Sequence, residues 1–137
     1  MDDYKRGGHS KYSMKVHLIF ATKYRKKIFK SNKRADDVKQ SLYDVAKKYD
    51  CEIIQMETDQ DHVHILLEYN PKISISDIVK QFKQYSTYRM WIYHKEYLSK
   101  QYWKYKTLWS DGYFACSIGQ LSQDIIERYI QNKIKKI

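Results

Sequence analysis

Proline and glycine are scarce in this chain of 137 residues, which contains one proline and four glycines. No linker rich in these residues, no repeat and no low-complexity tract divides the sequence into parts. A chain of this length is the size of one ordinary domain. We therefore predict a single domain over residues 1–137, of which residues 1–12 are expected to be flexible.

Cysteines and long apolar runs are also few. The chain has two cysteines, Cys51 and Cys116, and no Cys-x-x-Cys pair, which argues against a zinc ribbon or a redox motif. No apolar run approaches the roughly 20 residues that a membrane-spanning helix requires, and the first residues do not resemble a signal peptide. These absences predict a protein of the reducing cytoplasm with no membrane partner.

Positive charge, in contrast, is abundant. Lys and Arg number 26 against 16 Asp and Glu, so the formal net charge is +10, which favours a polyanionic partner. Many of the 14 tyrosines alternate with lysines, as in Tyr102-Trp-Lys-Tyr-Lys106. Aromatic rings on a basic surface suit unpaired bases, although a single tyrosine more often fills a half-buried surface. The composition points to nucleic acid without deciding the function.

Hydrophobic periodicity predicts four strands and three helices. The strands are expected over residues 15–22, 51–58, 62–69 and 108–118, and the helices over 34–48, 76–93 and 122–134. The polar turn 59–61 makes the second and third strands a hairpin, and Ser76 is the expected N-cap of the second helix. This order predicts an α+β ferredoxin-like or RRM-like plait, a four-stranded antiparallel sheet with two helices on one face. The C-terminal helix is an addition to that core.

A pair of histidines opens the third predicted strand. His62 and His64 are two residues apart, so both imidazoles project from the same face of the strand and can converge on a divalent cation, while Val63 faces the core. Asp59 and Asp61 can accept hydrogen bonds from the imidazoles. Two histidines on one strand face are more often surface or hydrogen-bonded residues, so these residues alone give only a hypothesis of a metal site.

Tyr129 lies in the predicted C-terminal helix, where the pattern alone favours a ring packed against the sheet. A phenol is a weak nucleophile at its usual pKa of about 10, so attack on a phosphate requires help from a metal or a nearby cation. Arg128 and Lys133 are candidate cations, and Lys133 shares the helix face of Tyr129.

Taken together, these motifs resemble the insertion-sequence 200/605 transposases, which are single-tyrosine members of the HUH superfamily. The resemblance runs from about Lys11 to Lys133, in the same order and spacing. It rests on four motifs: Lys23-Tyr-Arg-Lys-Lys27, His62-Val-His64, Leu108-Trp-Ser-Asp-Gly-Tyr-Phe114 and Tyr129-Ile-Gln-Asn132. It implies that Tyr129 attacks a DNA phosphodiester to give a 5′-phosphotyrosine and a free 3′-hydroxyl, so that strands can later be rejoined. It also implies that His62 and His64 hold Mg²⁺ or Mn²⁺ at the scissile phosphate.

The resemblance also implies partners and a location. Single-stranded DNA with hairpins at the element ends is the expected substrate, and a homodimer the expected assembly, with each active site pairing the histidines of one subunit with the tyrosine helix of the other. The expected location is a prokaryotic cytoplasm, in association with the nucleoid. The first strand, which contains Val16, Leu18 and Ile19, is the candidate pairing edge of the dimer. The candidate DNA contacts are Lys23, Arg25, Lys26, Lys27 and Lys133.

One position departs from the family pattern. Many members carry glutamine as a third metal ligand four residues after the tyrosine, where this chain has Lys133. Asn132 is a candidate replacement through its carbonyl oxygen; alternatively, Lys133 contacts the phosphate and water supplies the third ligand. Two other functions remain open: a catalytically silent hairpin-binding module, and a metal-dependent phosphodiesterase that uses activated water and in which Tyr129 is structural.

Overall fold

The computed structural model describes residues 14–117 and 128–132. Its elements are β1 (Met14–Ala21), α1 (Asn32–Lys48), β2 (Glu52–Thr58), β3 (His62–Tyr69), α2 (Ile75–Tyr93), α3 (Lys95–Gln101) and β4 (Phe114–Ser117). Two short 3-10 helices, η1 (Lys23–Arg25) and η2 (Ile28–Lys30), follow β1. Residues 128–132 are helical and belong to the predicted C-terminal helix. The rest of that helix, including Lys133, and residues 1–12 lie outside the described residues.

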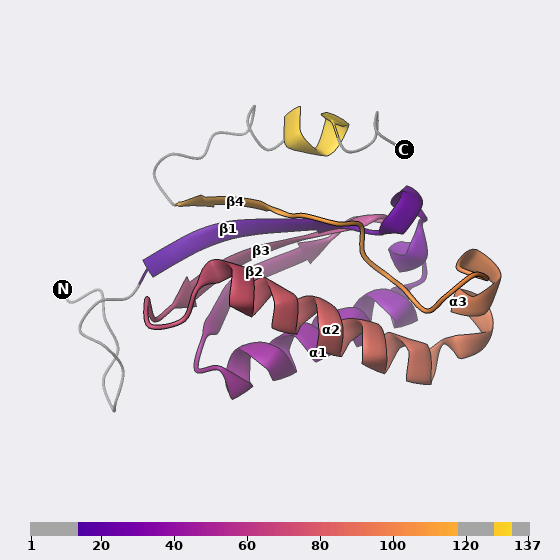
Figure 1. Cartoon of the computed structure of the whole chain (residues 1–137), viewed down its shortest axis with the longest axis horizontal. Helices are drawn as coiled ribbons and strands as arrows, with labels where there is room; N and C mark the ends of the chain where they lie inside the picture. The colour runs from indigo at the N-terminus through magenta and orange to yellow at the C-terminus, as the bar shows by residue number, and fades with distance from the viewer. Residues whose placement is uncertain (1–13, 118–127, 133–137) are drawn as a thin grey trace.

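The four strands form one antiparallel sheet in the order β2-β3-β1-β4. Helices α1 and α2 cover one face of this sheet, and the helical segment 128–132 lies on the opposite side (Figure 1). This order and layering confirm the predicted α+β plait. The sheet therefore has one face that packs on the helical layer and a second face available for a site.

The prediction that the first strand forms a free pairing edge is wrong. β1 is a central strand that pairs with β3 on one side and with β4 on the other. Apolar side chains lie on both faces of β1 because a central strand is buried on both faces. A strand that pairs with a second subunit can have the same pattern, so the sequence did not separate the two cases. The edges of the sheet are β2 and β4.

The hydrophobic core lies between the sheet and the two long helices. β1 and β3 point alternate side chains into it, and these are almost completely buried: Val16, Leu18, Phe20, Val63, Ile65 and Leu67. α1 and α2 supply the facing layer, which includes Val38, Leu42, Ile78 and Phe82. Each such burial contributes about 1.5–3 kcal/mol relative to exposure. This packing fixes which side chains of β3 face away from the core.

Serine side chains cap both long helices, at positions that differ from the predicted boundaries. Ser74, and not Ser76, is the N-cap of α2, because its Oγ accepts a hydrogen bond from the backbone N–H of Asp77 at 3.1 Å. Ser31 caps α1 by accepting from the backbone N–H of Arg34 at 3.3 Å. The hydrophobic stripe of each helix begins later than its cap, so the sequence pattern alone placed both starts too late.

The last strand is shorter than predicted. β4 begins at Phe114, and upstream of it only an isolated bridge joins Thr22 to Trp109. Leu108 and Trp109 are buried because their side chains pack into the core, where the indole N–H of Trp109 donates to Ser86 Oγ at 2.9 Å. α3 was not predicted. Within the described ranges, no helix combines the length and apolarity needed to cross a bilayer.

Candidate functional site

The alternation of β3 turns the histidine pair away from the helical layer. Val63 is fully buried in the core, as predicted, while His62 and His64 are half-buried on the opposite face. The strand register places His64 beside Ile19 of β1, which in turn lies beside Phe114 of β4. Paired residues of an antiparallel sheet share a face, so these three side chains form a row across three strands.

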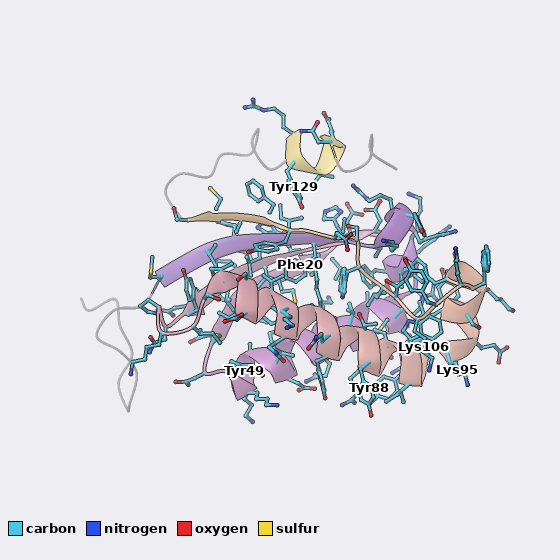
Figure 2. All side chains as sticks on the ribbon, viewed as in Figure 1. Phe20, Tyr49, Tyr88, Lys95, Lys106 and Tyr129 are labelled. Atoms are coloured by element: carbon cyan, nitrogen blue, oxygen red, sulfur yellow. The ribbon has the colours of Figure 1, made fainter. Side chains whose placement is uncertain are left out.

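Tyr129 covers the end of this row. Its ring centroid lies 4.9 Å from that of Phe114, and its side chain extends from the helical segment toward the sheet (Figure 2). The phenolic oxygen is buried, and this burial raises the pKa of Tyr129 to about 12 despite the opposing charge of Arg25. The structure thus brings the predicted nucleophile onto the same face as the histidine pair, in its neutral form.

Arg25 connects the helical segment of Tyr129 to the turn before β3. Its Nη1 donates to the backbone carbonyl of Ile130 at 3.0 Å, and its Nε donates to Asp61 Oδ2 at 3.1 Å. The side chain is only 8% exposed. The sequence placed Arg25 among the candidate DNA contacts and gave no sign of this linking role.

Asp61 carries the connection on to the histidine pair. Its second carboxylate oxygen lies 3.0 Å from His62 Nδ1, which is the contact with an imidazole that was predicted for Asp61. Burial alone raises the pKa of Asp61, but the hydrogen bonds from His62 and Arg25 and the charge of Arg25 outweigh it and lower this pKa to about 2. Asp59 does not share this role, because its side chain instead accepts from the backbone N–H of Gln60.

A third histidine, which the sequence reasoning missed, contacts the pair. His17 Nδ1 lies 2.8 Å from His64 Nε2, and the two rings are 5.0 Å apart. Burial lowers the pKa of both His17 and His64, which favours neutral imidazoles. The two residues are 47 positions apart in the chain, so only the pairing of β1 with β3 brings them together.

His62 and His64 are the described residues that could hold a divalent cation. The hydrogen bond to Asp61 fixes Nδ1 of His62 and leaves the other ring nitrogen available as a ligand. Within residues 14–117 and 128–132, no group of three or more His, Cys, Asp or Glu side chains is arranged to hold a metal. Two imidazoles therefore leave positions for phosphate oxygens, water or the amide of Asn132, which is exposed on the tyrosine segment.

The basic residues predicted to contact DNA do not share one environment. Arg25 points inward to Asp61 and Ile130, whereas Lys27 is exposed and Lys23 and Lys26 are half-buried. Lys133 lies outside the described residues. Phosphate contact by these side chains stays a prediction.

Comparisons with known proteins agree with this architecture. The family model of IS200-like transposases matches residues 10–133. The chain is 33% identical over 132 residues to the ISDra2 transposase TnpA of Deinococcus radiodurans, covering 96% of this chain and 92% of that protein. It is 29% identical over 136 residues to the transposase for insertion sequence element IS200 of Salmonella typhimurium, covering 99% and 87%.

Solved structures give the same fold. A transposase structure from Deinococcus radiodurans superposes with a TM-score of 0.81 at 32% identity, covering 94% of this chain and 96% of that one. A REP-associated tyrosine transposase bound to a REP hairpin superposes with a TM-score of 0.55 at 13% identity, covering 93% and 68%, and this likeness concerns the fold alone.

Proposed function

The chain belongs to the IS200-like transposase family, and from this premise we propose that it cleaves and rejoins single-stranded DNA at element ends with Tyr129 as the nucleophile. The observation that carries the proposal is the continuous chain of contacts from the tyrosine segment through Arg25 and Asp61 to His62. A tyrosine that only filled a gap on the sheet would not require a buried arginine tied to the histidine turn.

The proposed step exchanges one phosphate ester for another. The Tyr129 oxygen attacks the phosphorus and loses its proton, the bond from phosphorus to the 3′-oxygen breaks, and that oxygen gains a proton. The 5′-phosphate remains on Tyr129, so a later 3′-hydroxyl can attack it and rejoin strands without a nucleotide cofactor. The raised pKa of Tyr129 means that the phenol requires activation before it attacks, and the charge of Arg25 acts in that direction.

His62 and His64 are the residues that would hold the divalent cation, Mg²⁺ or Mn²⁺. When bound, such an ion polarises a phosphate and positions it for attack. Asp61 contacts and orients the ring of His62, and burial lowers the pKa of His64, which favours the neutral form that a ligand must have. We propose that the side-chain carbonyl oxygen of Asn132, on the tyrosine segment, is a further ligand of this cation.

We propose that the active form is a homodimer with composite sites, as the family resemblance implies. Because Arg25 ties the tyrosine segment to the histidine turn of its own chain here, the composite arrangement requires this segment to leave that contact and reach the histidines of the partner subunit. The edges that the sheet offers to a second subunit are β2 and β4, since β1 is paired on both sides. Mixing a Tyr129→Phe chain with a His64→Ala chain tests this arrangement. If the sites are composite, the mixed dimer regains a site with both groups intact and cleaves, whereas each variant alone does not.

Covalent capture of DNA tests the nucleophile. The protein is incubated with single-stranded DNA from an element end and Mn²⁺, with the label on the 3′ end, and the products are separated on a denaturing gel. The wild-type protein should give a labelled adduct that resists denaturation, because Tyr129 keeps the 5′-phosphate of the labelled fragment. Tyr129→Phe should give none, and Tyr43→Phe, which removes a hydroxyl from the exposed Tyr43 of α1, should behave as wild type.

Two outcomes would contradict the proposal. Cleavage that survives in Tyr129→Phe would mean that activated water attacks and that the chain acts as a phosphodiesterase. Binding of hairpin DNA without cleavage by the wild-type protein would mean a silent binding module.

A further inference from the structure

A short loop after α3 carries a run of exposed aromatic and basic side chains. Residues 103–106, Trp-Lys-Tyr-Lys, follow α3, and all four are exposed. The loop is firmly held on both sides. The buried Tyr102 donates its hydroxyl to the backbone carbonyl of Lys23 at 2.8 Å, and the indole N–H of Trp91 donates to the carbonyl of Thr107 at 2.8 Å. The exposed side chains therefore project from a fixed backbone.

Two of these side chains join a third aromatic ring around a surface hollow. The hollow has a volume of about 240 Å³ and is lined mainly by Tyr24, Tyr102, Trp103, Lys104, Tyr105 and Thr107; we call it the aromatic hollow. Trp103 is 82% exposed, Tyr24 57% and Tyr105 55%. Single exposed apolar residues are ordinary, but three aromatic rings gathered around one concave site mark a binding surface. Its volume is below the roughly 300 Å³ at which typical small-molecule pockets begin, which suits a single ring system.

The side chains around the hollow are basic, which favours a negatively charged ligand. Lys104 lies in the lining, Lys106 follows in the loop, and Lys23 Nζ lies 5.6 Å from the ring centroid of Tyr24. No acidic side chain is among the described residues that line the hollow. The cores of protein interfaces are depleted of lysine, whereas binding sites for single-stranded nucleic acid combine exposed aromatic rings with basic side chains. The combination fits an unpaired base with its phosphates.

The backbone of η1 links this hollow to the candidate active site. Tyr24 and Arg25 both have positive φ angles, 58° and 52°, in the left-handed region that side chains with a Cβ avoid. This conformation turns two consecutive side chains in opposite senses: Tyr24 lies outward in the hollow and Arg25 inward on Asp61 and Ile130. One strained turn thus joins the aromatic hollow to the residues that hold the tyrosine segment.

We propose that the aromatic hollow binds one unpaired base of single-stranded DNA, stacked on Trp103 and Tyr105, with Lys23 and Lys104 contacting the flanking phosphates. The choice of DNA rests on the proposed function, whereas the stacking rests on the hollow itself. The bound base would lie in the strand that flanks the cleavage position, and the hollow would retain that strand before and after Tyr129 reacts.

Tryptophan fluorescence gives a direct test. Of the three tryptophans, Trp91 and Trp109 are 7% and 6% exposed, so a stacked base can quench only Trp103. The full chain carrying Tyr129→Phe, which cannot form an adduct, is titrated with a short oligothymidine that contains no hairpin. We expect saturable quenching, together with an affinity that can be measured independently from the anisotropy of dye-labelled oligothymidine.

Variants separate stacking from other effects. Trp103→Ala and Tyr105→Ala should each weaken binding about five- to one-hundred-fold, and Trp103→Phe should restore most of the affinity because it keeps a flat ring. Tyr43→Ala is the matched control, since Tyr43 is an exposed tyrosine of α1 that lines a different pocket together with Asp50 and Glu52 and should not contribute. Lys104→Gln should lower the dependence of affinity on salt.

Several results would overturn the proposal. Oligothymidine that binds without quenching Trp103, unchanged affinity in Trp103→Ala, or equal quenching by a duplex would each exclude a stacked base. Tighter binding of oligouridine would assign the hollow to RNA, and loss of dimerisation in Trp103→Ala would assign it to a protein interface. Because the titrated chain cannot cleave, a failed adduct experiment with intact quenching would reject only the proposed catalytic function.

Discussion

Arg25 and Ile130 are joined by a hydrogen bond of 3.0 Å, although 105 positions separate them in the chain. The acceptor is the backbone carbonyl of the residue that directly follows Tyr129. The same guanidinium binds Asp61, which in turn orients His62. The position of the candidate nucleophile and the orientation of a candidate metal ligand therefore depend on one side chain.

Replacing this side chain should release the tyrosine segment. In Arg25→Ala, we expect amide hydrogen exchange of residues 128–132 to accelerate about tenfold or more, because a hydrogen bond from a charged group contributes about 1.5–3 kcal/mol. Hydrogen exchange read by mass spectrometry measures this change. Lys30→Ala, which removes an exposed charge at the end of η2, is the control and should exchange as wild type. Unchanged protection in Arg25→Ala would show that other contacts hold the segment.

The carboxylate of Asp61 should stabilise the fold in a pH-dependent manner. Its pKa is lowered from 3.8 to about 2, so its contribution to stability is fully present above about pH 4 and is lost as pH falls to about 2. At neutral pH, Asp61→Asn should lower the free energy of unfolding by about 2 kcal/mol, and the difference from wild type should shrink as the solution is acidified. Urea unfolding at several pH values measures this.

Asp36→Asn is the matched substitution for that experiment, since Asp36 is an exposed carboxylate of α1. It should leave the unfolding curve close to that of wild type across the same pH range. If the wild-type protein and the Asp61→Asn variant lose stability in parallel on acidification, the ion pairs of Asp61 are not the cause of the pH dependence of stability.

Metal binding should depend on the histidine pair before any chemistry takes place. His62→Ala or His64→Ala should abolish saturable Mn²⁺ binding, and Asp61→Asn should weaken it about ten- to one-hundred-fold because His62 loses its orienting partner. The electron paramagnetic resonance signal of free Mn²⁺ reports the bound fraction. His94→Ala removes a histidine whose ring contacts Asp37 at the end of α2, and it should bind Mn²⁺ normally. Binding that survives loss of both histidines would place the metal elsewhere.

The cap of α2 offers a test of the fold that is independent of function. Ser74→Ala removes the side-chain acceptor of the Asp77 N–H and should lower the free energy of unfolding by about 1 kcal/mol. Ser76→Ala should have a much smaller effect, since Ser76 lies inside the first turn of the helix. Chemical denaturation of the two variants compares them, and an equal loss in both would argue against Ser74 as the cap.

Local signals in the sequence were sufficient for most of the fold. Helix periodicity predicted α1 and α2, alternation predicted β1 and β3, and the polar turn predicted the hairpin, because each signal lies within one element. The errors arose where contacts with residues distant in the sequence decide the structure. Leu108 and Trp109 have a strand-like composition, but their side chains pack into the core and their backbone forms only an isolated bridge. The apolar pattern of β1 showed that the strand is buried on both faces, but it did not show that β1 lies in the centre of the sheet.

The candidate site also contains residues that the local sequence could predict and residues that it could not. His62, His64 and the orienting role of Asp61 could be predicted because they are adjacent in the chain and strand alternation sets their directions. His17 and the linking role of Arg25 could not, since each acts on a partner that only the tertiary fold brings near. Basic residues in one motif also look equivalent in the sequence, although positive φ angles send Tyr24 outward and Arg25 inward.

The central place of β1 also sets the order in which the molecule can be completed. A chain that leaves the ribosome from its N-terminus exposes β1 well before β3 and long before β4, and contacts between distant segments form late. Arg25 likewise emerges long before its acceptor at Ile130. A nascent chain therefore displays both histidines without the tyrosine that would cut. On the proposed mechanism, a chain can contribute a nucleophile only after synthesis has passed Tyr129, whereas its histidine pair is complete much earlier.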